Sequence, residues 1–426
     1  MWGERVKMEK FRIIGEKRLY GRIKVDASKN SILPIVSASL LTDKEVIIEK
    51  IPEIADVFKM FEILRNLGSE VVYDGELKKV SIKNNNINSF EIPERLASEL
   101  RSSFFMLGPM LSRFKKARVA YPGGCDIGSR PIDLHLFGLR ELGVKISEDF
   151  GFITCDGASM KPSVIHLDFP SVGATENLMM ASVLVKGETI ILNPAKEPEI
   201  IDLQNFINQM GGDISGAGSN KIVINGVKKL HGTTFSPIPD RIVAGTYMIA
   251  TALTRGRVEI EDVNAEHVFS LINKLKKSGC NIEFNNGIII VESSKRLHGI
   301  SFETQPYPGF PTDLQPQLSV LSAVGRGVSV VTENLFETRF RHLQEMMRMG
   351  AKVTFRDRMA LIRGVPKLHG ASVIAHDLRG GAALTLAGLV AHGVTTVENV
   401  NFIDRGYVRL EKQLNSLGAE IERIKS

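Results

Sequence analysis

A glycine at the end of a helix-like run recurs six times along the chain. An alternating, strand-like segment follows each one, as in Leu67-Gly68-Ser-Glu-Val-Val and Met349-Gly350-Ala-Lys-Val. Spaced by roughly 70 residues, these glycines are Gly68, Gly143, Gly211, Gly279, Gly350 and Gly418. Near-equal intervals of this length are the signature of a repeated structural unit. The chain is therefore restricted to folds that are built from six copies of one unit.

Short tetrapeptides keep the same period. They read Lys229-Leu-His-Gly232, Arg296-Leu-His-Gly299 and Lys367-Leu-His-Gly370, with Arg18-Leu-Tyr-Gly21 as a weaker copy. Histidine is a common catalytic and metal-binding residue, but repetition at equivalent positions favours a role in the repeat itself. We therefore predict a structural role for these three histidines. We also predict that the six repeated glycines end helices in the left-handed conformation.

A second kind of helix-like segment, rich in small and apolar residues, recurs with the repeat. A helix that is apolar nearly all round is a buried helix. Most of these segments precede a partly alternating stretch such as Thr189-Ile-Ile-Leu192, which suggests a sheet with one face in water. The six segments are 31–41, 103–111, 178–185, 244–253, 317–324 and 382–390. The sequence thus predicts an α/β protein of two domains, each with three units of buried helices and outer sheets.

Charge and composition exclude several classes of protein. The 54 basic and 48 acidic residues of this 426-residue chain are interleaved, whereas a nucleic-acid binder usually gathers its basic residues in one block. Cys125, Cys155 and Cys280 are far apart and have neither metal-ligand nor disulfide spacing, so reduced thiols are expected. No signal peptide and no apolar stretch of about 20 residues is found. We expect a cytosolic protein with no metal, membrane span or nucleic-acid partner.

The stretch from Tyr121 to Asp133 presents a thiol. It reads Tyr-Pro-Gly-Gly-Cys-Asp-Ile-Gly-Ser-Arg-Pro-Ile-Asp, which places Cys125 among three glycines, with Arg130 five residues further on. Glycine allows sharp turns and a close approach of the backbone to a ligand. One interpretation is a reactive loop. The alternative is an ordinary surface turn whose cysteine is incidental.

The starts of the buried helices carry N-cap residues and charges. Asp26, Ser171, Asp240, Asp313 and Asp377 are of the type that accepts hydrogen bonds from free backbone N–H groups. Cations stand at the same starts, and they are Lys29, Arg101, Arg241 and Arg379. Helix N-termini and guanidinium groups both favour anions, so we expect a multiply anionic ligand, against the alternative of solvated surface charges. No P-loop and no strand-anchored GxGxxG occurs.

The ordered motifs resemble those of the enolpyruvyl transferases, over nearly the whole chain from about Met8, and in particular the branch that acts on UDP-N-acetylglucosamine. The matching stretches are 27–34, 122–135, 170–175, 197–202, 239–242, 310–315, 336–340, 377–379 and 403–407. The resemblance implies two inside-out α/β domains built from six βαβαββ repeats, three per domain. It also implies a domain of residues 1–28 plus 239–426, closed by the N-terminal segment, and a domain of residues 29–238 that carries the Cys125 loop as a lid.

The activity implied by this resemblance transfers the enolpyruvyl group of phosphoenolpyruvate to the 3-hydroxyl of UDP-N-acetylglucosamine and releases phosphate. This is the first committed step of peptidoglycan synthesis, in the cytoplasm, and the family is inhibited by fosfomycin. The two small molecules are the expected partners, and no cofactor or metal is implied, because lysine and arginine supply the positive charge. Protein partners are not indicated.

The resemblance also assigns roles to residues. Cys125 matches the general acid and Asp313 the carboxylate at the sugar hydroxyl, a candidate base. Lys29, Arg130 and Arg405 match the cations that grip phosphoenolpyruvate, with Arg379 beside them and Arg101 as another anion contact. The positions expected to line the nucleotide sugar are Asn30, Arg130, Pro131, Ile132, Asp133, Leu134, Ser171, Val172, Gly173, Asp240, Asp313 and Leu335.

Two departures and two alternatives accompany the resemblance. Asp26-Ala-Ser precedes Lys29 in place of the family's usual Ser-Gly-Ala, and Gly380-Gly381 is expected to loosen a helix start. One alternative is the sister enzyme that makes 5-enolpyruvylshikimate 3-phosphate, which generally lacks the loop cysteine and has serine where this chain has Asn30. The other is a non-catalytic paralogue that binds nucleotide sugar. Cys125 and Asn30 argue against the first, and the presence of Cys125, Asp313, Lys29 and both C-terminal arginines argues against the second.

Overall fold

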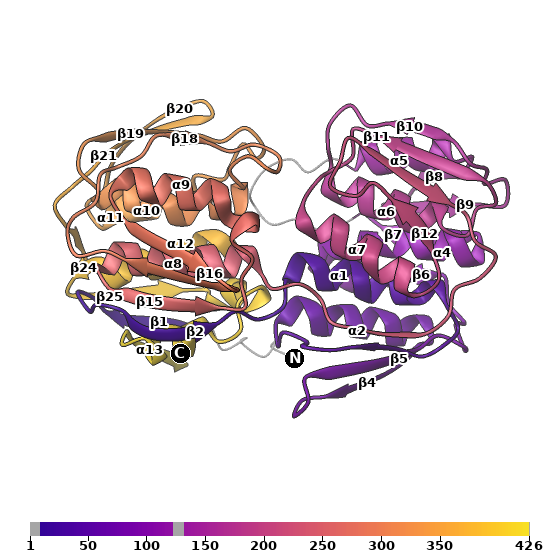
Figure 1. Ribbon diagram of the computed structural model, residues 1–426, viewed down its shortest axis with the longest axis horizontal. Coiled ribbons are helices and arrows are strands. Elements are labelled where there is room, and N and C mark those ends of the chain that lie inside the picture. The colour runs from indigo at the N-terminus through magenta and orange to yellow at the C-terminus, as the bar shows by residue number, and fades with distance from the viewer. Residues whose placement is uncertain (1–8, 122–131, 426) are drawn as a thin grey trace. The chain divides into compact units, whose positions relative to one another are not determined.

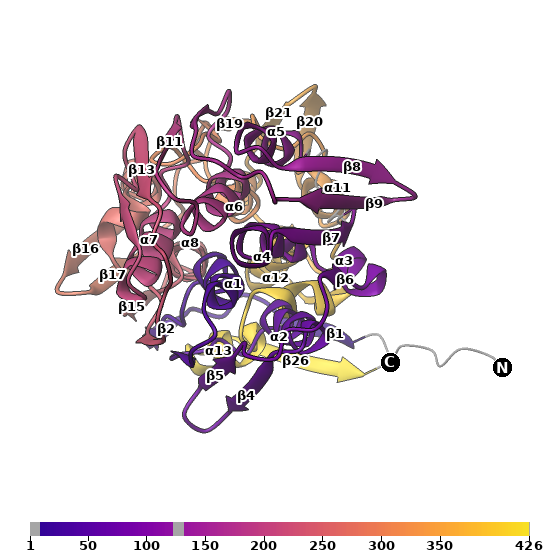
Figure 2. The same ribbon diagram turned by 90° about the vertical axis from the view of Figure 1, so that its right-hand side faces the viewer.

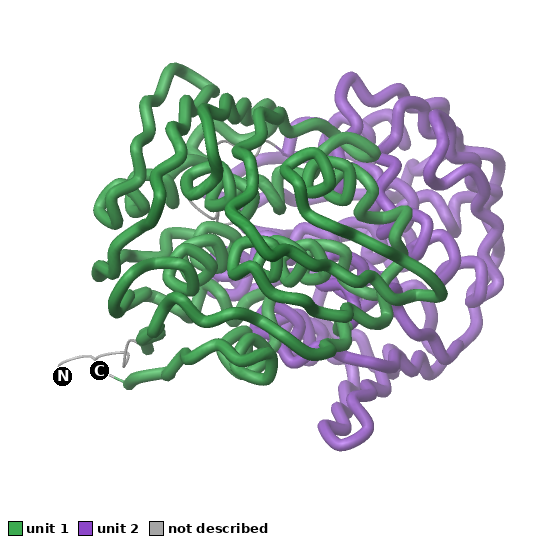
Figure 3. Tube along the Cα trace, turned by 60° about the vertical axis from the view of Figure 1, so that its left-hand side comes forward, with its two compact units in different colours: residues 1–26, 125–129, 239–426 green, residues 27–124, 130–238 purple. Residues whose placement is uncertain are grey.

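The computed structural model describes residues 9–121 and 132–425, which fall into two compact units. Unit 1 comprises residues 9–26 and 239–425, and unit 2 comprises residues 27–121 and 132–238, within the described ranges (Figure 3). Each unit has its own sheets and its own buried helices, so each is described by itself.

Unit 1 contains three four-stranded sheets among its described residues, ordered β23-β25-β1-β26, β16-β17-β15-β2 and β18-β19-β21-β20. The N-terminal strands belong to this unit, since β1 lies between β25 and β26 and β2 pairs with β15. The strands are β1 (Glu9–Ile14), β2 (Tyr20–Lys24), β15 (Arg257–Glu261), β16 (Asn281–Asn285), β17 (Ile288–Glu292), β18 (Phe302–Glu303), β19 (Val328–Thr332), β20 (Lys352–Arg356), β21 (Met359–Arg363), β22 (Leu368–His369), β23 (Ser372–Ile374), β24 (Ala391–His392), β25 (Val394–Glu398) and β26 (Glu420–Lys425).

Unit 2 repeats the pattern in its described part, with sheets ordered β14-β3-β5-β4, β6-β7-β9-β8 and β10-β11-β13-β12. In each sheet one edge strand runs parallel to its neighbour and the other pairs are antiparallel, as in the three sheets of unit 1. The strands are β3 (Val46–Ile48), β4 (Glu70–Asp74), β5 (Lys79–Lys83), β6 (Glu91–Ile92), β7 (Lys116–Ala120), β8 (Lys145–Asp149), β9 (Phe152–Asp156), β10 (Val164–His166), β11 (Glu188–Leu192), β12 (Asp213–Ser215), β13 (Lys221–Asn225) and β14 (Thr233–Phe235).

Helices fill the inside of each unit and the sheets lie around them (Figures 1 and 2). In unit 1 these helices are α8 (Arg241–Thr254), η3 (Ala265–Val268), α9 (Phe269–Ser278), η4 (Thr312–Leu314), α10 (Gln315–Val324), α11 (Arg341–Arg348), α12 (Leu378–Val390), η5 (Val400–Arg405) and α13 (Leu410–Ser416). In unit 2 they are α1 (Lys29–Ala38), η1 (Ser39–Leu41), α2 (Ala55–Leu67), α3 (Glu94–Glu99), η2 (Arg101–Met106), α4 (Leu107–Phe114), α5 (Asp133–Glu141), α6 (Val172–Ser182) and α7 (Pro198–Gln209).

The most buried helices are those predicted from their apolar composition. Every residue of α8 is buried, and α12 is buried along its whole length except for Val390. Burial on all sides removes nearly every apolar side chain of such a helix from water, at about 25 cal/mol for each Å² buried. The predicted α/β class, with buried helices and outer sheets in three units per domain, is confirmed.

The repeated glycines and histidines have the structural role predicted for them. All six glycines have positive φ, between 86° at Gly143 and 104° at Gly68. The side chains of the repeated histidines are exposed, and it is their backbone N–H groups that make the structural hydrogen bonds. His231, His298 and His369 each donate to the carbonyl of the residue before a repeated glycine, at 2.8, 2.9 and 2.9 Å. Each tetrapeptide thus satisfies a carbonyl that a helix end leaves unpaired.

One predicted helix is interrupted. The segment 103–111 was expected to be a single buried helix, but residues 101–106 form the 3-10 helix η2 and α4 begins only at Leu107. Pro109 stands near the start of α4, where the missing N–H of proline is tolerated.

Among the described residues, no helix is both long and apolar enough to cross a bilayer.

Candidate functional site

In unit 1 the candidate base Asp313 is held by two buried guanidinium groups. Its Oδ1 accepts a hydrogen bond of 2.9 Å from Arg339, and its Oδ2 accepts bonds of 3.2 and 3.1 Å from Nε and Nη2 of Arg379. The side chains of both arginines are only 2–3% exposed, whereas that of Asp313 is 28% exposed. A carboxylate gripped on both oxygens has a fixed orientation and keeps one side accessible.

Arg339 was given no role in the sequence analysis. It lies in Phe336-Glu-Thr-Arg-Phe340, one of the stretches that carried the resemblance, so the signal was present. His342, on the first turn of α11, holds the backbone of this arginine through Nδ1 and the Arg339 carbonyl at 3.1 Å. Burial lowers the pKa of His342 to about 4, so the ring is neutral near pH 7. Because a neutral ring adds no charge, His342 can only position Arg339.

A buried hydrogen-bond network that includes the Tyr407 hydroxyl lies next to Arg379. Its guanidinium lies 5.3 Å from the ring centre of Tyr407, whose hydroxyl is 2.9 Å from Thr246 and 3.1 Å from Gln317. Burial opposes the charged form of Arg379, but Tyr407 and the carboxylates of Asp313 and Asp240 raise its pKa above the ordinary value. The guanidinium is therefore a permanent cation at the start of α12.

The predicted N-caps are present at three of the helix starts. Asp240 accepts from Ile242 and Val243 at the start of α8, and Asp377 accepts from Arg379 and Gly380 at the start of α12. In unit 2, Ser171 accepts from Ala174 at the start of α6. The prediction is wrong for Asp313, because the N-cap of α10 is Leu314, and the carboxylate of Asp313 binds two guanidinium groups. It is also wrong for Asp26, because the N-cap of α1 is Ser28.

The expectation that Gly380-Gly381 loosens the start of α12 is wrong. Both glycines are buried, and Gly380 N–H donates to the capping Asp377 at 2.9 Å. A Cβ at Gly380 would lie 2.5 Å from Oδ2 of Asp377, and one at Gly381 would lie 2.8 Å from Ile403. Glycine is needed here for close packing, and the helix start is well defined.

Two further predicted residues lie in unit 1. Arg405 is the last residue of η5 and is half-buried. Leu335 follows β19, and its backbone N–H donates to Glu333 at 2.9 Å. Asp240, which caps α8, is 3% exposed.

In unit 2 the predicted cation Lys29 begins α1 and pairs with a buried carboxylate. Its Nζ lies 2.7 Å from Oδ2 of Asp56, on α2, with the two side chains 12% and 2% exposed. Asn30 follows on the same turn and is half-buried. Asp56 was not among the site residues predicted from the sequence. Its place in the first turn of an amphipathic helix gave no sign of the partner that folding brings to it.

The start of α6 lies against a histidine with a defined tautomer. Asn177 accepts from the N–H of Gly108 through Oδ1, so its Nδ2 is a donor, and Nδ2 lies 2.8 Å from Nδ1 of His135. Nδ1 is then the acceptor, and the ring proton is on Nε2. Burial, with Arg101 nearby, lowers the pKa of His135 to about 3. A Cβ on Gly173 would lie 3.1 Å from that Nε2, so the ring packs closely against this glycine.

The remaining predicted residues of unit 2 surround this point or lie outside the described ranges. Arg101 begins η2, and Ser171, Val172 and Gly173 are half-buried. Ile132 is buried, Asp133 is exposed and begins α5, and Leu134 is half-buried. Three predicted residues, Cys125, Arg130 and Pro131, are outside the residues that the structure describes.

A buried carboxylic acid lies on α6 beyond this region. Glu176 is fully buried, and neither of its carboxyl oxygens has a hydrogen-bond partner among the described residues. Burial, with Glu199 and Glu197 nearby, raises the pKa of Glu176 well above 4.5. The sequence analysis did not single out this residue. A glutamate in the middle of an apolar helix was the available signal.

The two cysteines that the structure describes are both buried. Burial raises the pKa of Cys155 and of Cys280 to about 12, so each is a protonated thiol near pH 7. The described residues contain no group of three or more metal-ligating side chains. The chemistry that these residues offer is cation-assisted binding of anions, with one oriented carboxylate that can accept a proton.

Comparisons with known proteins agree with this chemistry. The family model of EPSP synthase (3-phosphoshikimate 1-carboxyvinyltransferase) matches residues 13–414. The chain is 51% identical to UDP-N-acetylglucosamine 1-carboxyvinyltransferase 2 of Caldanaerobacter subterraneus subsp. tengcongensis, over 98% of this chain and 100% of that protein. It is 45% identical to UDP-N-acetylglucosamine 1-carboxyvinyltransferase of Thermotoga maritima, over 98% of this chain and 99% of that protein.

Solved structures give the same fold. The enolpyruvyl transferase NikO from Streptomyces tendae aligns with a TM-score of 0.88 and 25% identity, over 99% of this chain and 100% of NikO. An EPSP synthase from Acinetobacter baumannii aligns with a TM-score of 0.75 and 20% identity, over 98% of this chain and 100% of that enzyme. The second likeness supports the fold alone.

Proposed function

The chain belongs to the enolpyruvyl transferase family, and on that basis we propose that it transfers the enolpyruvyl group of phosphoenolpyruvate to the 3-hydroxyl of UDP-N-acetylglucosamine and releases phosphate. The observation that carries the proposal is the 45–51% identity, over nearly full length, to proteins named for that transfer. The oriented carboxylate of Asp313 and the helix-start cations are the groups that such a reaction needs.

The reaction is an addition followed by an elimination. The sugar hydroxyl oxygen bonds to C2 of phosphoenolpyruvate while C3 gains a proton, and the hydroxyl proton is taken by a base. Loss of phosphate from C2 and of a proton from C3 then restores the double bond. Asp313 is the proposed base, and Cys125 is the proposed acid at C3. Lys29, Arg130 and Arg405 neutralise the phosphate and carboxylate charges, beside Arg379, with Arg101 as a further anion contact.

The nucleotide sugar is assigned to the remaining predicted residues. The N-terminal turn of α6, Ser171 to Gly173, offers backbone N–H groups to an anion. In the family's pattern it is accompanied by Asn30, Pro131, Ile132, Asp133, Leu134, Asp240 and Leu335. His135 is added on structural grounds, because it packs against Gly173 and has a neutral ring.

A phosphate-release assay tests the proposal. Purified protein with phosphoenolpyruvate should release phosphate when UDP-N-acetylglucosamine is added, and should release none above background with shikimate 3-phosphate. Release with shikimate 3-phosphate alone would assign the sister activity. Binding of UDP-N-acetylglucosamine without phosphate release would assign a non-catalytic paralogue.

Cys125 has a separate test. The epoxide fosfomycin should alkylate Cys125, and mass spectrometry should locate the label there. Cys155 and Cys280 should remain unlabelled, because burial keeps both thiols protonated and covered. A label found only on those two cysteines would remove Cys125 from the mechanism. In that case the variant Cys125→Ala would retain full turnover, whereas the proposed role of Cys125 requires this variant to lose it.

We place this activity at the entry to peptidoglycan synthesis in the cytoplasm, where both substrates are small soluble molecules. The names of the relatives support this place. We propose two domains: one is formed by residues 1–28 together with residues 239–426, and the other by residues 29–238.

A further inference from the structure

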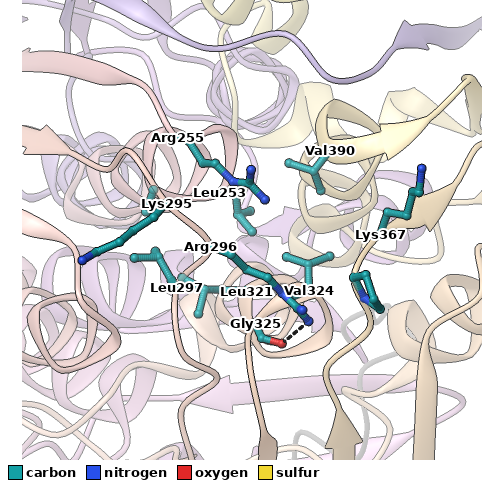
Figure 4. Close-up of a pocket in the computed structure, with 12 residues that line it drawn as sticks. Leu253, Arg255, Lys295, Arg296, Leu297, Leu321, Val324, Gly325, Lys367 and Val390 are labelled. Atoms are coloured by element: carbon teal, nitrogen blue, oxygen red, sulfur yellow. Dashed lines mark hydrogen bonds between the residues drawn. The ribbon is translucent and has the colours of Figure 1, made fainter.

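Unit 1 has a cavity at the C-terminal ends of its buried helices, away from the helix starts described above. The last turns of α8, α10 and α12 contribute its apolar floor, and the tetrapeptides that begin at Arg296 and Lys367 contribute its rim (Figure 4). The cavity is a hollow in the surface that is partly open to solvent. Its lining residues are Ala252, Leu253, Arg255, Lys295, Arg296, Leu297, Leu321, Val324, Gly325, Pro366, Lys367 and Val390.

The lining is unusual in its charge. It contains four cations, Arg255, Lys295, Arg296 and Lys367, and no acidic residue. Helix C-termini carry partial negative charge, which attracts cations, so a purely structural role for the four must be considered first. Of the four cations, only Arg296 has this structural role. Arg296 donates to the carbonyls of Val324, Gly325 and Val365 at 2.8 to 2.9 Å, and it thereby neutralises the end of α10.

Arg255 does not have such a role. It is the C-cap of α8 with φ of 57°, a left-handed conformation that costs a non-glycine residue about 1 kcal/mol. Within the described ranges its guanidinium makes no hydrogen bond or ion pair. Figure 4 shows it directed over the apolar floor, near Leu253. The Arg255 side chain is exposed, so its donors are available to a ligand that lies beside the apolar floor.

Unit 2 provides the contrast. Lys115 is also a C-cap with left-handed φ, of 62°, at the end of α4, but its Nζ donates to the carbonyl of Ser112 at 2.8 Å. Arg113 donates to the carbonyls of Leu40, Thr42 and Asn84 at 2.9 to 3.0 Å. Both of these helix-end cations of unit 2 are thus satisfied by carbonyl groups.

The other two rim cations of unit 1 add positive charge at different depths. Lys367 stands at the rim, and the ammonium of Lys295 points away from the floor (Figure 4). Neither ammonium has a hydrogen bond or ion pair among the described residues. The carboxylate of Glu16 is bonded to His392 at 2.9 Å and interacts through space with Lys367. Arg255 and Lys367 therefore give the cavity its net positive potential.

We propose that this cavity is a binding site for a small organic anion that joins a phosphate or carboxylate to a compact apolar group. Arg255 and Lys367 bind the anion, and the floor of Leu253, Leu321 and Val390 covers the apolar group. The site is distinct from the residues assigned to enolpyruvyl transfer, and its test does not depend on that assignment.

Isothermal titration of the full chain with phenyl phosphate tests the proposal. The double variant Arg255→Gln/Lys367→Gln should bind at least about tenfold more weakly than the unaltered protein, because two charge-assisted contacts are lost. The matched control Arg363→Gln/Lys352→Gln removes one arginine and one lysine from an exposed pair of positions on β21 and β20. It should bind as the unaltered protein does. Both variants should keep the turnover of the unaltered protein.

Two further arms define the ligand class and locate it. Inorganic phosphate and benzyl alcohol should each bind more weakly than phenyl phosphate, since each lacks one half of the ligand. Hydrogen–deuterium exchange should show protection by phenyl phosphate at residues 252–255 and 366–367. Equal affinity of the double variant and the unaltered protein would overturn the proposal. So would equal weakening by the control variant, or protection that is absent from these segments.

Discussion

Both units pair carboxylates with cations at the starts of their buried helices, but the more exposed member of the pair differs between them. In unit 1 a half-exposed carboxylate, Asp313, lies between two buried guanidinium groups. In unit 2 a nearly buried ammonium, Lys29, lies against the buried carboxylate of Asp56. The same repeat therefore supplies a proton acceptor in one unit and a fixed cation in the other. The difference shows that the repeated backbone determines where the functional groups lie. A few side chains determine whether the charge at that place is positive or negative.

The strongest way to break this comparison is to remove the acceptor. Asp313→Asn keeps the shape but cannot take a proton, so turnover should fall about 10³-fold. Binding of UDP-N-acetylglucosamine should remain, as measured by titration. Asp357→Asn, in an exposed hairpin of the same unit, is the control and should leave phosphate release unchanged. Turnover above a tenth of the original value in Asp313→Asn would assign the base elsewhere.

Removing the cation of unit 2 should have the next largest effect. Lys29→Gln loses a charge that is proposed to neutralise phosphoenolpyruvate, so kcat/KM for that substrate should fall about 10²-fold. Lys59→Gln is the matched control. It removes a lysine that pairs with Glu99 at 2.9 Å on a more exposed face of α2, and it should change kcat/KM less than twofold. Similar losses in both variants would indicate a general charge effect.

The grip on Asp313 can be loosened without removing charge. Arg339→Lys keeps a cation but loses the guanidinium geometry that reaches Oδ1 at 2.9 Å. We expect kcat to fall about tenfold with little change in KM, because orientation of the base matters most in the transition state. Arg358→Lys, which changes an arginine on an exposed salt bridge to Glu337, should have no effect. A change confined to KM would make Arg339 a binding residue.

The smallest effect concerns stability in unit 2. The pKa of Glu176 is raised well above 4.5 in the folded protein, so above pH 4.5 the folded state retains a proton that the unfolded state loses. Stability must then fall as pH rises from 4.5 toward the raised pKa. Glu176→Gln should remove this fall, raising Tm by about 3 °C at pH 8 and leaving it unchanged at pH 4.

The control for this prediction is Glu188→Gln, at an exposed position on β11 of the same unit. Its Tm should follow that of the unaltered protein across the pH range, measured by calorimetry. A Glu176→Gln variant with a Tm lowered equally at both pH values would show that the carboxyl group is needed for packing, and that its protonation has no part in stability.

Much of the fold was predictable because the repeat makes the same local choices six times. The positive φ of Gly68 and its five counterparts follows from a helix that must end before a strand. The burial of α8 and α12 follows from their apolar composition. The break between η2 and α4 was missed, although Pro109, near the start of α4, was an available signal in the sequence.

Part of the candidate site could be proposed from the sequence. Lys29 and Asp313 were identified through motifs, and both lie at helix starts with charged partners. Arg339 and His135 were missed, because their importance depends on what they touch. Arg339 is 26 residues from Asp313 in the sequence, and His135 is 42 residues from Asn177. Partners at such separations are brought together by packing alone.

The sequence by itself determined the repeat, the class of fold and the residue types that enolpyruvyl transfer requires, because periodicity and residue chemistry are local properties. Only the tertiary structure decided which charges are paired. It showed that Asp313 is held by Arg339 and Arg379, and that Arg113 is satisfied by carbonyl groups while Arg255 is not. Pairing depends on distances of about 3 Å between groups far apart along the chain, and those distances exist only after the helices and sheets have packed.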